Sequence, residues 1–399
     1  MRYILRHKNI DVALLELEPA GFDVRGIEVL ADGHFPLGVR RESEALRAWW
    51  KFRNIPSDRS GVSAILRDNN LSGVDELALG SFGLNLSDQY WIVPESKAGF
   101  SWDELNFFDN DFSDEAGKVF GALKSVQGMA LPDHATSGQL IKRWVIEDGT
   151  RYLIKGATYP NLLEAYSEKA GSVICRHLGI NHAHYEVVID KLLKYKILRE
   201  EGYPASKCAC LVGRDTELIH AENVIRLAEI DGRESYYERC LKGFEALGVA
   251  DARRRIDEMI VVDYLLANTD RHEYNFGAIR NADTLGEVSF APLFDFGNSM
   301  LYAEDDRLVA FPFCRTQKEQ IGLVSDFSWY EPERLKPAIE EVEGVMAENR
   351  HTRGGELAAQ EAVEGLKGKV ASLGRIAAQK NLEGKYYLGA RGGGGDDGQ

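Results

Sequence analysis

The chain has 399 residues, of which 44% are hydrophobic, and a formal net charge of −15 at pH 7. This length indicates two or three domains, and the apolar fraction is ample for a sizeable core. The acidic charge disfavours direct binding of nucleic acid over a broad surface, because phosphate backbones would be repelled. Nucleic acid is therefore not expected as a direct partner.

The sequence also lacks the usual marks of a membrane or secreted protein. It has no apolar run of about 18 residues, and its start lacks a long apolar segment, so neither a membrane span nor a signal peptide is expected. Its five cysteines are odd in number and scattered along the chain, so they do not indicate a disulfide framework. Reduced thiols in a cytoplasmic protein are the expectation.

Residues 1–125 are expected to form an N-terminal α/β module. The pattern of YILRHKNIDVALLELE predicts strands, and SEALRAWWKF predicts a helix with Ser43 as its cap. The segment SWDELNFFDNDFSDEAG combines carboxylates with aromatic side chains. The favoured interpretation is a solvated boundary segment that packs its Phe and Trp side chains against a neighbour, and capture of a basic partner is the alternative.

Residues 126–222 are expected to form a mixed lobe. QLIKRWVIEDGTRYLIKGA predicts two strands joined at Asp148-Gly149, a strong hairpin signal. NLLEAYSEKAGSVICRHLGI predicts a helix that stops at Gly179. HAHYEVVID and KCACLVG predict further strands.

Residues 223–385 are expected to form a helical lobe, followed by a disordered Gly-rich tail at 386–399. The apolar helix DARRRIDEMIVVDYLLAN runs directly into the polar stretch TDRHEYN, and the apolar FAPLF precedes DFGNS. The order is therefore a strand-rich module, a mixed lobe and a helical lobe, which is an α+β protein with two polar motifs in its last lobe.

Five side chains, spread over the mixed lobe and the helical lobe, meet the demands of phosphoryl transfer. Asp270 and Asn275 are spaced as D-x-x-x-x-N, and Asp295 follows in D-F-G. Asp and Asn oxygens are ligands for Mg²⁺, and a second Asp can accept the proton of an attacking hydroxyl. Lys155 on a strand can neutralise phosphates, with Glu168 of the next helix orienting it. Each feature alone is common, and their conjunction predicts phosphotransferase chemistry.

The motifs NTDRHEYNFG and APLFDFGNS resemble those of the HipA-like kinase family. They are more distantly similar to those of phosphatidylinositol kinases, whose catalytic loop also carries D-R-H-x-x-N. The likeness to HipA covers roughly 130–310 and includes RYLIKGA and EAYSEKAGSVICRHLG in the family's order. It implies a protein-kinase-like two-lobed fold that uses ATP and Mg²⁺ to phosphorylate Ser/Thr hydroxyls of a protein substrate.

The resemblance also implies a role for each matching residue. Asp270 would be the catalytic base, Asn275 and Asp295 the metal ligands, and Lys155 the phosphate-binding lysine. Its ion-pair partner would be Glu168, or Glu164 one turn earlier. KCACLVG would lead to the interlobe hinge, where backbone groups bind adenine. The family's N-terminal module corresponds only loosely to residues 1–125.

The expected phosphate loop departs from that of conventional protein kinases. In place of G-x-G-x-x-G the chain has HATSGQ, whose Thr136, Ser137 and Gly138 could meet phosphate through hydroxyl and backbone N–H groups. In the HipA family this loop can be autophosphorylated on serine, which makes Ser137 the candidate. An ordinary turn serine is the alternative.

Several alternatives stay open. The chain could be the toxin component of a toxin–antitoxin pair, with an antitoxin or regulator protein as partner. It could instead be a lipid or small-molecule kinase, although no basic amphipathic stretch supports the lipid version, or a non-catalytic regulator with a kinase fold. His182, His184, Cys208 and Cys210 could form a zinc site, although core thiols and partly buried histidines are commoner. For His272, a structural role in its loop is favoured over phosphate contact.

Overall fold

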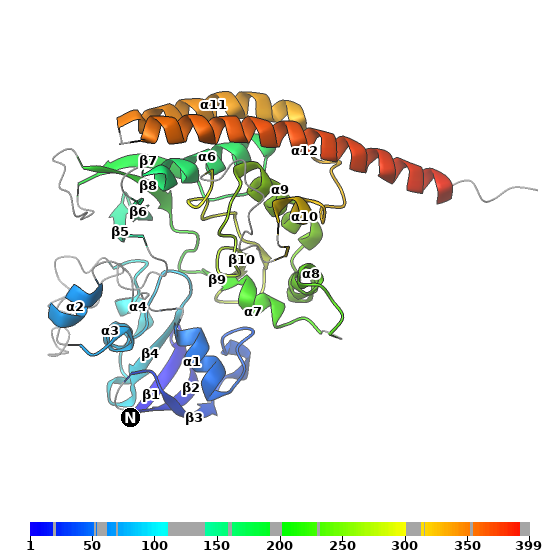
Figure 1. The fold of residues 1–399 in the computed structure, drawn as a ribbon. Helices are drawn as coiled ribbons and strands as arrows, with labels where there is room; N and C mark the ends of the chain where they lie inside the picture. Colours follow the sequence, from blue (N-terminus) through cyan, green and yellow to red (C-terminus); the bar gives the residue numbers. More distant parts are fainter. Residues whose placement is uncertain are drawn as a thin grey trace, which may run out of the picture.

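The fold has an N-terminal module and two lobes, and the long helices α11 and α12 lie along one side of the molecule (Figure 1). The computed structural model describes residues 1–18, 21–51, 53, 62–68, 71–110, 140–158, 162–191, 202–229, 232–300, 313–314, 316–351 and 354–391. The N-terminal module packs against both lobes, at the end of the molecule away from these two helices (Figure 1).

The N-terminal module is built on an antiparallel sheet of order β3-β2-β1-β4. Its elements are β1 (Arg2–His7), β2 (Ile10–Leu17), β3 (Val24–Val29), α1 (Ser43–Lys51), α2 (Val62–Asp68), α3 (Val74–Gly80), β4 (Tyr90–Pro94) and α4 (Trp102–Leu105). Apolar residues on both faces of the sheet are buried, in one cluster with Trp50 of α1 and a second with Trp102 of α4. The module therefore has its own core.

The N-lobe is a sheet of order β5-β6-β8-β7. Its elements are β5 (Lys142–Glu147), β6 (Thr150–Lys155), α6 (Leu163–Leu178), β7 (Tyr185–Asp190) and β8 (Tyr203–Ala209), with α6 packed on β7 and β8. The predicted hairpin is confirmed: β5 and β6 pair across Asp148 and Gly149, whose φ angles of 49° and 76° suit a tight two-residue turn. The predicted helix stop is confirmed too, since Gly179 caps α6 with φ 72°.

The C-lobe contains most of the helices. Its elements are β9 (Thr216–His220), α7 (Ala221–Ile225), α8 (Tyr236–Leu247), α9 (Ala252–Leu266), β10 (Gly277–Asn281), β11 (Ser289–Phe290), α10 (Gln317–Ile321), α11 (Leu335–Ala347) and α12 (Gly355–Arg391). Helix α9 is buried on almost every face after its first turns, so it is anchored in the lobe's core. This anchoring gives the polar stretch after it a rigid support.

The structure differs from the sequence expectations at three places. β9 lies in the range expected for the N-lobe, yet it pairs with β10 in a sheet of order β11-β10-β9. The strand expected over KCACLVG begins earlier and ends at Ala209. α12 continues to Arg391, into the segment expected to be a disordered tail. Each difference lies at an element boundary, which local sequence patterns locate poorly.

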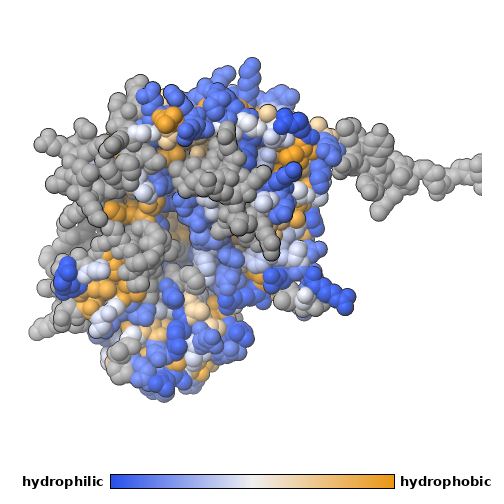
Figure 2. All heavy atoms as spheres, viewed as in Figure 1, coloured by the Kyte–Doolittle hydropathy of each residue, from blue (hydrophilic) through white to orange (hydrophobic). Residues whose placement is uncertain are grey.

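On the face drawn in Figure 2, hydrophilic residues dominate around α11 and α12. Hydrophobic residues are more prominent toward the N-terminal module (Figure 2). Among the helices of the described part of the chain, none is long and apolar enough to cross a membrane.

Candidate active site

Lys155 lies at the end of β6 and its ammonium group is held between two carboxylates. Its Nζ donates a hydrogen bond of 2.7 Å to Glu168 Oε1 on α6 and a second one to Asp295 Oδ1 in the D-F-G loop. Lys155 and Glu168 are both buried. Glu164 instead accepts from the backbone N–H of Thr158 at 3.1 Å. Of the two glutamates considered from the sequence, Glu168 is therefore the one that contacts Lys155.

This ion cluster shifts the pKa values of Lys155 and Asp295 in opposite directions. Burial by itself would lower the pKa of Lys155, but the Asp295 and Glu168 carboxylates outweigh it and hold that pKa well above its ordinary value. Burial would raise the pKa of Asp295, but Lys155, with help from Lys142 and Arg271, holds it far below its ordinary value. Lys155 is therefore a cation and Asp295 an anion over the whole neutral range.

The D-F-G loop is bound to the N-lobe by its backbone. Asp295 has φ 59°, a left-handed conformation that a non-glycine residue adopts only where its surroundings enforce it. Its N–H donates to the Tyr185 hydroxyl at 3.1 Å, and the N–H of Phe296 donates to Glu168 Oε2 at 2.7 Å. Glu168 thus holds both Lys155 and the backbone next to Asp295.

Helix α6 has room for the Phe296 ring because of a glycine. A Cβ added at Gly171 would lie 2.4 Å from Phe296 Cγ, far inside van der Waals contact. Phe296 is completely buried. The close approach of α6 to this ring therefore sets the position of the loop that carries Asp295.

The stretch after α9 is organised by a buried arginine. Arg271 and Asp263 are both fully buried, and the guanidinium Nε lies 3.0 Å from Asp263 Oδ2. Arg271 Nη1 also donates to the carbonyls of Asn275 and Phe294, each at 2.5 Å. Since Phe294 directly precedes the D-F-G loop, Arg271 ties the two polar motifs together.

Asp270 is the exposed member of the site, with 41% of its side chain accessible. Asn298 Nδ2 donates to Asp270 Oδ2 at 2.8 Å, which leaves the carboxylate oriented but open to solvent. His272 lies 4.0 Å from Asp270 Oδ1 and accepts from the N–H of Tyr274 at 3.2 Å. These contacts agree with the structural role in the loop that was favoured for His272.

Within the described part of the chain, no group donates a hydrogen bond to Asn275 Oδ1, so this oxygen can face a cation. Its Nδ2 donates to the backbone carbonyl of Asp270 at 2.8 Å, so the amide nitrogen is already used and Oδ1 is the remaining group. Asn275 and Asp295 line the same cavity. An amide oxygen and a carboxylate are hard ligands that suit Mg²⁺, so these two residues fit the expected metal.

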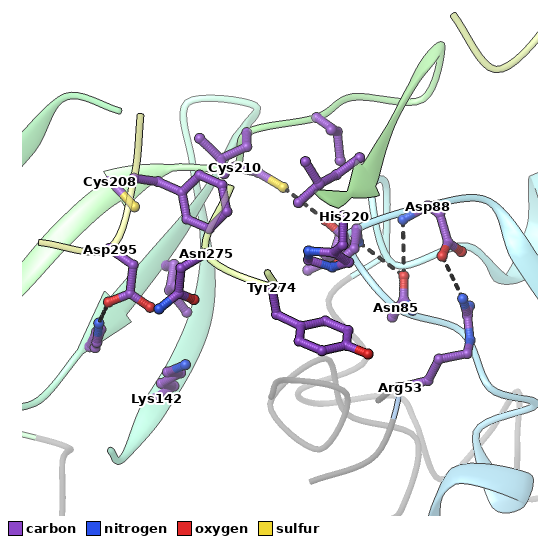
Figure 3. Close-up of a pocket in the computed structure, with 18 of the residues that line it drawn as sticks. Arg53, Asn85, Asp88, Lys142, Cys208, Cys210, His220, Tyr274, Asn275 and Asp295 are labelled. Carbon is purple, nitrogen blue, oxygen red and sulfur yellow. Dashed lines mark hydrogen bonds and ion pairs between the residues drawn. The ribbon is translucent and has the colours of Figure 1, made fainter. Parts of the chain in front are cut away.

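The cavity has a volume of about 420 Å³ and is bordered by both lobes and the N-terminal module. Figure 3 shows Asp295, Asn275 and Lys142 at one end, and Arg53, Asn85 and Asp88 at the other, with His220 and Tyr274 between them. Cys208, Cys210 and Val212 border it where the chain leaves β8. This is the segment expected to lead to the hinge.

The structure brings together Lys155, Glu168, Asn275 and Asp295, and it places Asp270 one contact away through Asn275. Thr136, Ser137 and Gly138 lie outside the described residues. Across the described ranges, no group of three or more His, Cys, Asp or Glu side chains is arranged to hold a metal ion, which includes the four residues considered for zinc.

Sequence reasoning missed Arg271 as the link between the motifs, although its place in D-R-H was visible. It also missed the wall that Trp49 and Arg53 of the N-terminal module contribute to the cavity. No local signal connects these two residues with a site more than 100 positions further along the chain.

The chain belongs to the family with a HipA-like C-terminal domain, whose model matches residues 129–350. Its fold is therefore α+β and protein-kinase-like, as expected from the motifs. A search of curated proteins found no match.

The solved structures that are similar to this chain include the following two. HipA of Shewanella oneidensis MR-1, solved in a toxin–antitoxin complex with HipB and operator DNA, has a TM-score of 0.51 at 11% identity and covers 92% of this chain and 96% of its own. The proinflammatory kinase CtkA of Helicobacter pylori has a TM-score of 0.44 at 15% identity and covers 62% of this chain and 93% of its own. At such identities, the likeness to HipA concerns the fold.

Proposed function

We propose that this protein is an ATP- and Mg²⁺-dependent kinase that transfers the γ-phosphate of ATP to a Ser/Thr hydroxyl of a protein. One observation carries the proposal: Lys155 lies between the carboxylates of Glu168 and Asp295, in a cavity that Asn275 also lines. A strand lysine paired with a helix glutamate, beside an aspartate and an asparagine, is the arrangement that protein kinases use for phosphoryl transfer from ATP.

Each residue has a defined part in this proposal. Lys155 would contact the phosphates, and Asn275 and Asp295 would hold Mg²⁺, which neutralises phosphate charge when bound. Asp270, oriented by Asn298 and open to solvent, would accept the proton of the incoming hydroxyl. The hydroxyl oxygen bonds to the γ-phosphorus as the bond from that phosphorus to the β,γ-bridging oxygen breaks, and ADP leaves.

Further parts of the proposal concern partners and organisation. The similar HipA was solved with the antitoxin HipB, which supports an antitoxin or regulator protein as a partner. That structure also contains operator DNA, so the expected absence of nucleic-acid contact is not retained. Ser137 stays a candidate for autophosphorylation. The N-terminal module is proposed to end near residue 125, and the C-lobe to begin at β9 because β9 pairs with β10.

The test is transfer of labelled γ-phosphate by the purified protein with Mg²⁺, alone, with cell lysate and with phosphoinositide vesicles. The expected result is label in protein, and no label when EDTA is present to chelate Mg²⁺. Label in lipid would favour the lipid-kinase alternative. No label in any arm, with ATP bound normally, would favour a non-catalytic regulator.

Asp270→Asn and Asp295→Asn separate the proposed roles, because each keeps the side-chain size and removes the charge. Asp270→Asn should retain the affinity for Mg-ATP in calorimetry while transfer falls by about two to four orders of magnitude, as for loss of a positioned base. Asp295→Asn should weaken Mg-ATP binding as well as transfer. If Asp270→Asn strongly weakens ATP binding while the rate at saturating ATP stays intact, Asp270 is a nucleotide ligand instead.

A further inference from the structure

The segment that joins the two lobes is bonded to the N-terminal module. We call residues 210–215, between β8 and β9, the connector. The Gln89 side chain is completely buried at the start of the module's last strand. Its Nε2 donates to the carbonyl of Gly213 at 2.8 Å and to that of Thr216, the first residue of β9, at 2.7 Å. One amide group thus holds the turn through which the chain enters the C-lobe.

Neighbouring residues of the module continue this contact along the connector. The N–H of Leu218 in β9 donates to the carbonyl of Ser87 at 2.8 Å. At the other end, the Cys210 thiol donates to the carbonyl of Leu86 at 3.4 Å. The stretch 86–89 therefore follows the chain from the end of β8 into β9, and its first residues also line the cavity.

This stretch of the module is itself fixed. Asn85 Oδ1 accepts from the N–H groups of Ser87 at 2.9 Å and Asp88 at 3.1 Å. Asp88 pairs with the buried guanidinium of Arg53, which lies 4.4 Å from the centre of the Trp49 ring. Because these polar groups already have partners, the stretch offers the connector a rigid support.

We propose that Gln89 is a positioning residue for the nucleotide pocket, because it fixes the connector and with it the relation of the lobes. The inference rests on the proposed kinase function, since the pocket is taken to hold ATP. A pocket formed by two lobes binds only while they are correctly placed, and the apparent affinity falls with the fraction of molecules in that state. Gln89 would keep this fraction high before ATP arrives.

Gln89→Met tests the inference, because methionine has nearly the same length and lacks the N–H donor. The KM for ATP and the Kd for a non-hydrolysable ATP analogue should rise about five- to tenfold, as expected if the competent state becomes a minority. The rate at saturating ATP should change less than about twofold, since bound ATP restores that state. Amide exchange in residues 210–216 should quicken without nucleotide.

Gln89→Glu is the conservative variant. A protonated carboxyl can donate to one of the two carbonyls, whereas a carboxylate repels both. While that carboxyl is protonated, the KM should lie between those of wild type and Gln89→Met, and it should rise with pH more steeply than either as the carboxyl ionises.

Leu15→Ala is the matched control, because Leu15 is fully buried in the module's own core and takes no part in these contacts. It should destabilise the module and leave the KM for ATP within about twofold of wild type. An equal rise in KM in both variants would mean that module stability, not the Gln89 amide, is responsible.

The outcomes separate the two proposals. If wild type binds ATP and Gln89→Met keeps both its KM and its slow exchange in 210–216, the role of Gln89 is overturned and the kinase proposal stands. If wild type neither binds nor turns over ATP, the kinase proposal is overturned and Gln89 positions no nucleotide pocket.

Discussion

At the scale of single residues, the buried Lys155 ammonium group lies between the buried Glu168 carboxyl and the partly exposed Asp295 carboxylate. Lys155→Met should abolish measurable phosphate transfer and lower the free energy of unfolding by about 3–5 kcal/mol, because the Glu168 and Asp295 carboxylates lose their counter-ion. Urea unfolding measures this change. Glu168→Leu alone should also destabilise, by leaving Phe296 N–H unpaired.

The double variant Lys155→Met with Glu168→Leu provides the check on that prediction. Its destabilisation should be smaller than the sum of the two single effects, because the buried charge and its partner leave together. Strict additivity would show that the contact between Lys155 and Glu168 contributes nothing. Activity should stay absent in all three variants.

His220 gives the site a defined pH dependence. Burial lowers its pKa to about 4, against an ordinary value of 6.5. Between these values the unfolded chain binds a proton that the folded chain does not, so the free energy of unfolding should fall as the pH drops from 6.5 toward 4. Above pH 6.5, His220 does not make the free energy of unfolding depend on pH.

Thermal unfolding over this pH range tests the assignment. His220→Gln should show a shallower decline than wild type, because the group that takes up the proton on unfolding is gone. His184→Gln, at an exposed position, serves as the control and should retain the wild-type slope. If both variants behave alike, other groups account for the acid sensitivity.

At the scale of elements, α6 sets the position of the D-F-G loop through one missing side chain. Gly171→Ala would push a methyl group into the Phe296 ring, which should shift Asp295 and reduce phosphate transfer at least about tenfold, although residue 171 touches no substrate. The stability should fall by about 1–3 kcal/mol, the usual cost of overpacking.

Gly368→Ala in α12 is the matched control, because nothing lies within 4 Å of the added Cβ. There alanine should raise stability by up to about 1 kcal/mol through its helix propensity and leave transfer unchanged. Equal activity in Gly171→Ala and wild type would show that the loop adjusts freely to α6.

Most of the elements that carry the site were visible in the sequence because their signals are local. Asp148-Gly149 specified the hairpin that presents Lys155, and the apolar α9 specified a buried support for the next motif. The short strand β10 was missed, because five residues carry too little pattern to separate it from loop. The sequence also left Glu164 and Glu168 open as partners of Lys155, and only the rotation of α6 decided between them.

At the scale of the whole molecule, a buried histidine of the module contacts a buried ion pair of the C-lobe, and no local sequence pattern predicts this contact. Glu217 of β9 accepts from Arg280 Nε at 2.7 Å and lies 3.1 Å from Nε2 of His7 in β1. All three side chains are buried. The docking of the module therefore depends on contacts between residues far apart in the chain.

Glu217→Ala should separate the unfolding of the module from that of the rest. Removing the carboxylate leaves the buried Arg280 uncompensated, which should cost about 3–5 kcal/mol and split one thermal transition into two. Arg214→Ala is the control at the same interface, because its pairs with Asp103 and Asp109 are exposed and should contribute about 1 kcal/mol or less. Calorimetry measures the loss of stability in both variants, and equal losses would contradict the predicted difference.

The distance along the chain between these partners has a consequence for synthesis. His7 and Glu217 are 210 residues apart, and Lys8 and its partner Asp283 are 275 apart. At about 5–20 residues per second, a ribosome completes the module, proposed to end near residue 125, roughly 5–20 s before it delivers β9. During that interval the module can fold on its own core, while Gln89 and His7 stay hydrated. The cavity is therefore completed late in synthesis. The module that forms one of its walls is made long before the catalytic residues of the C-lobe.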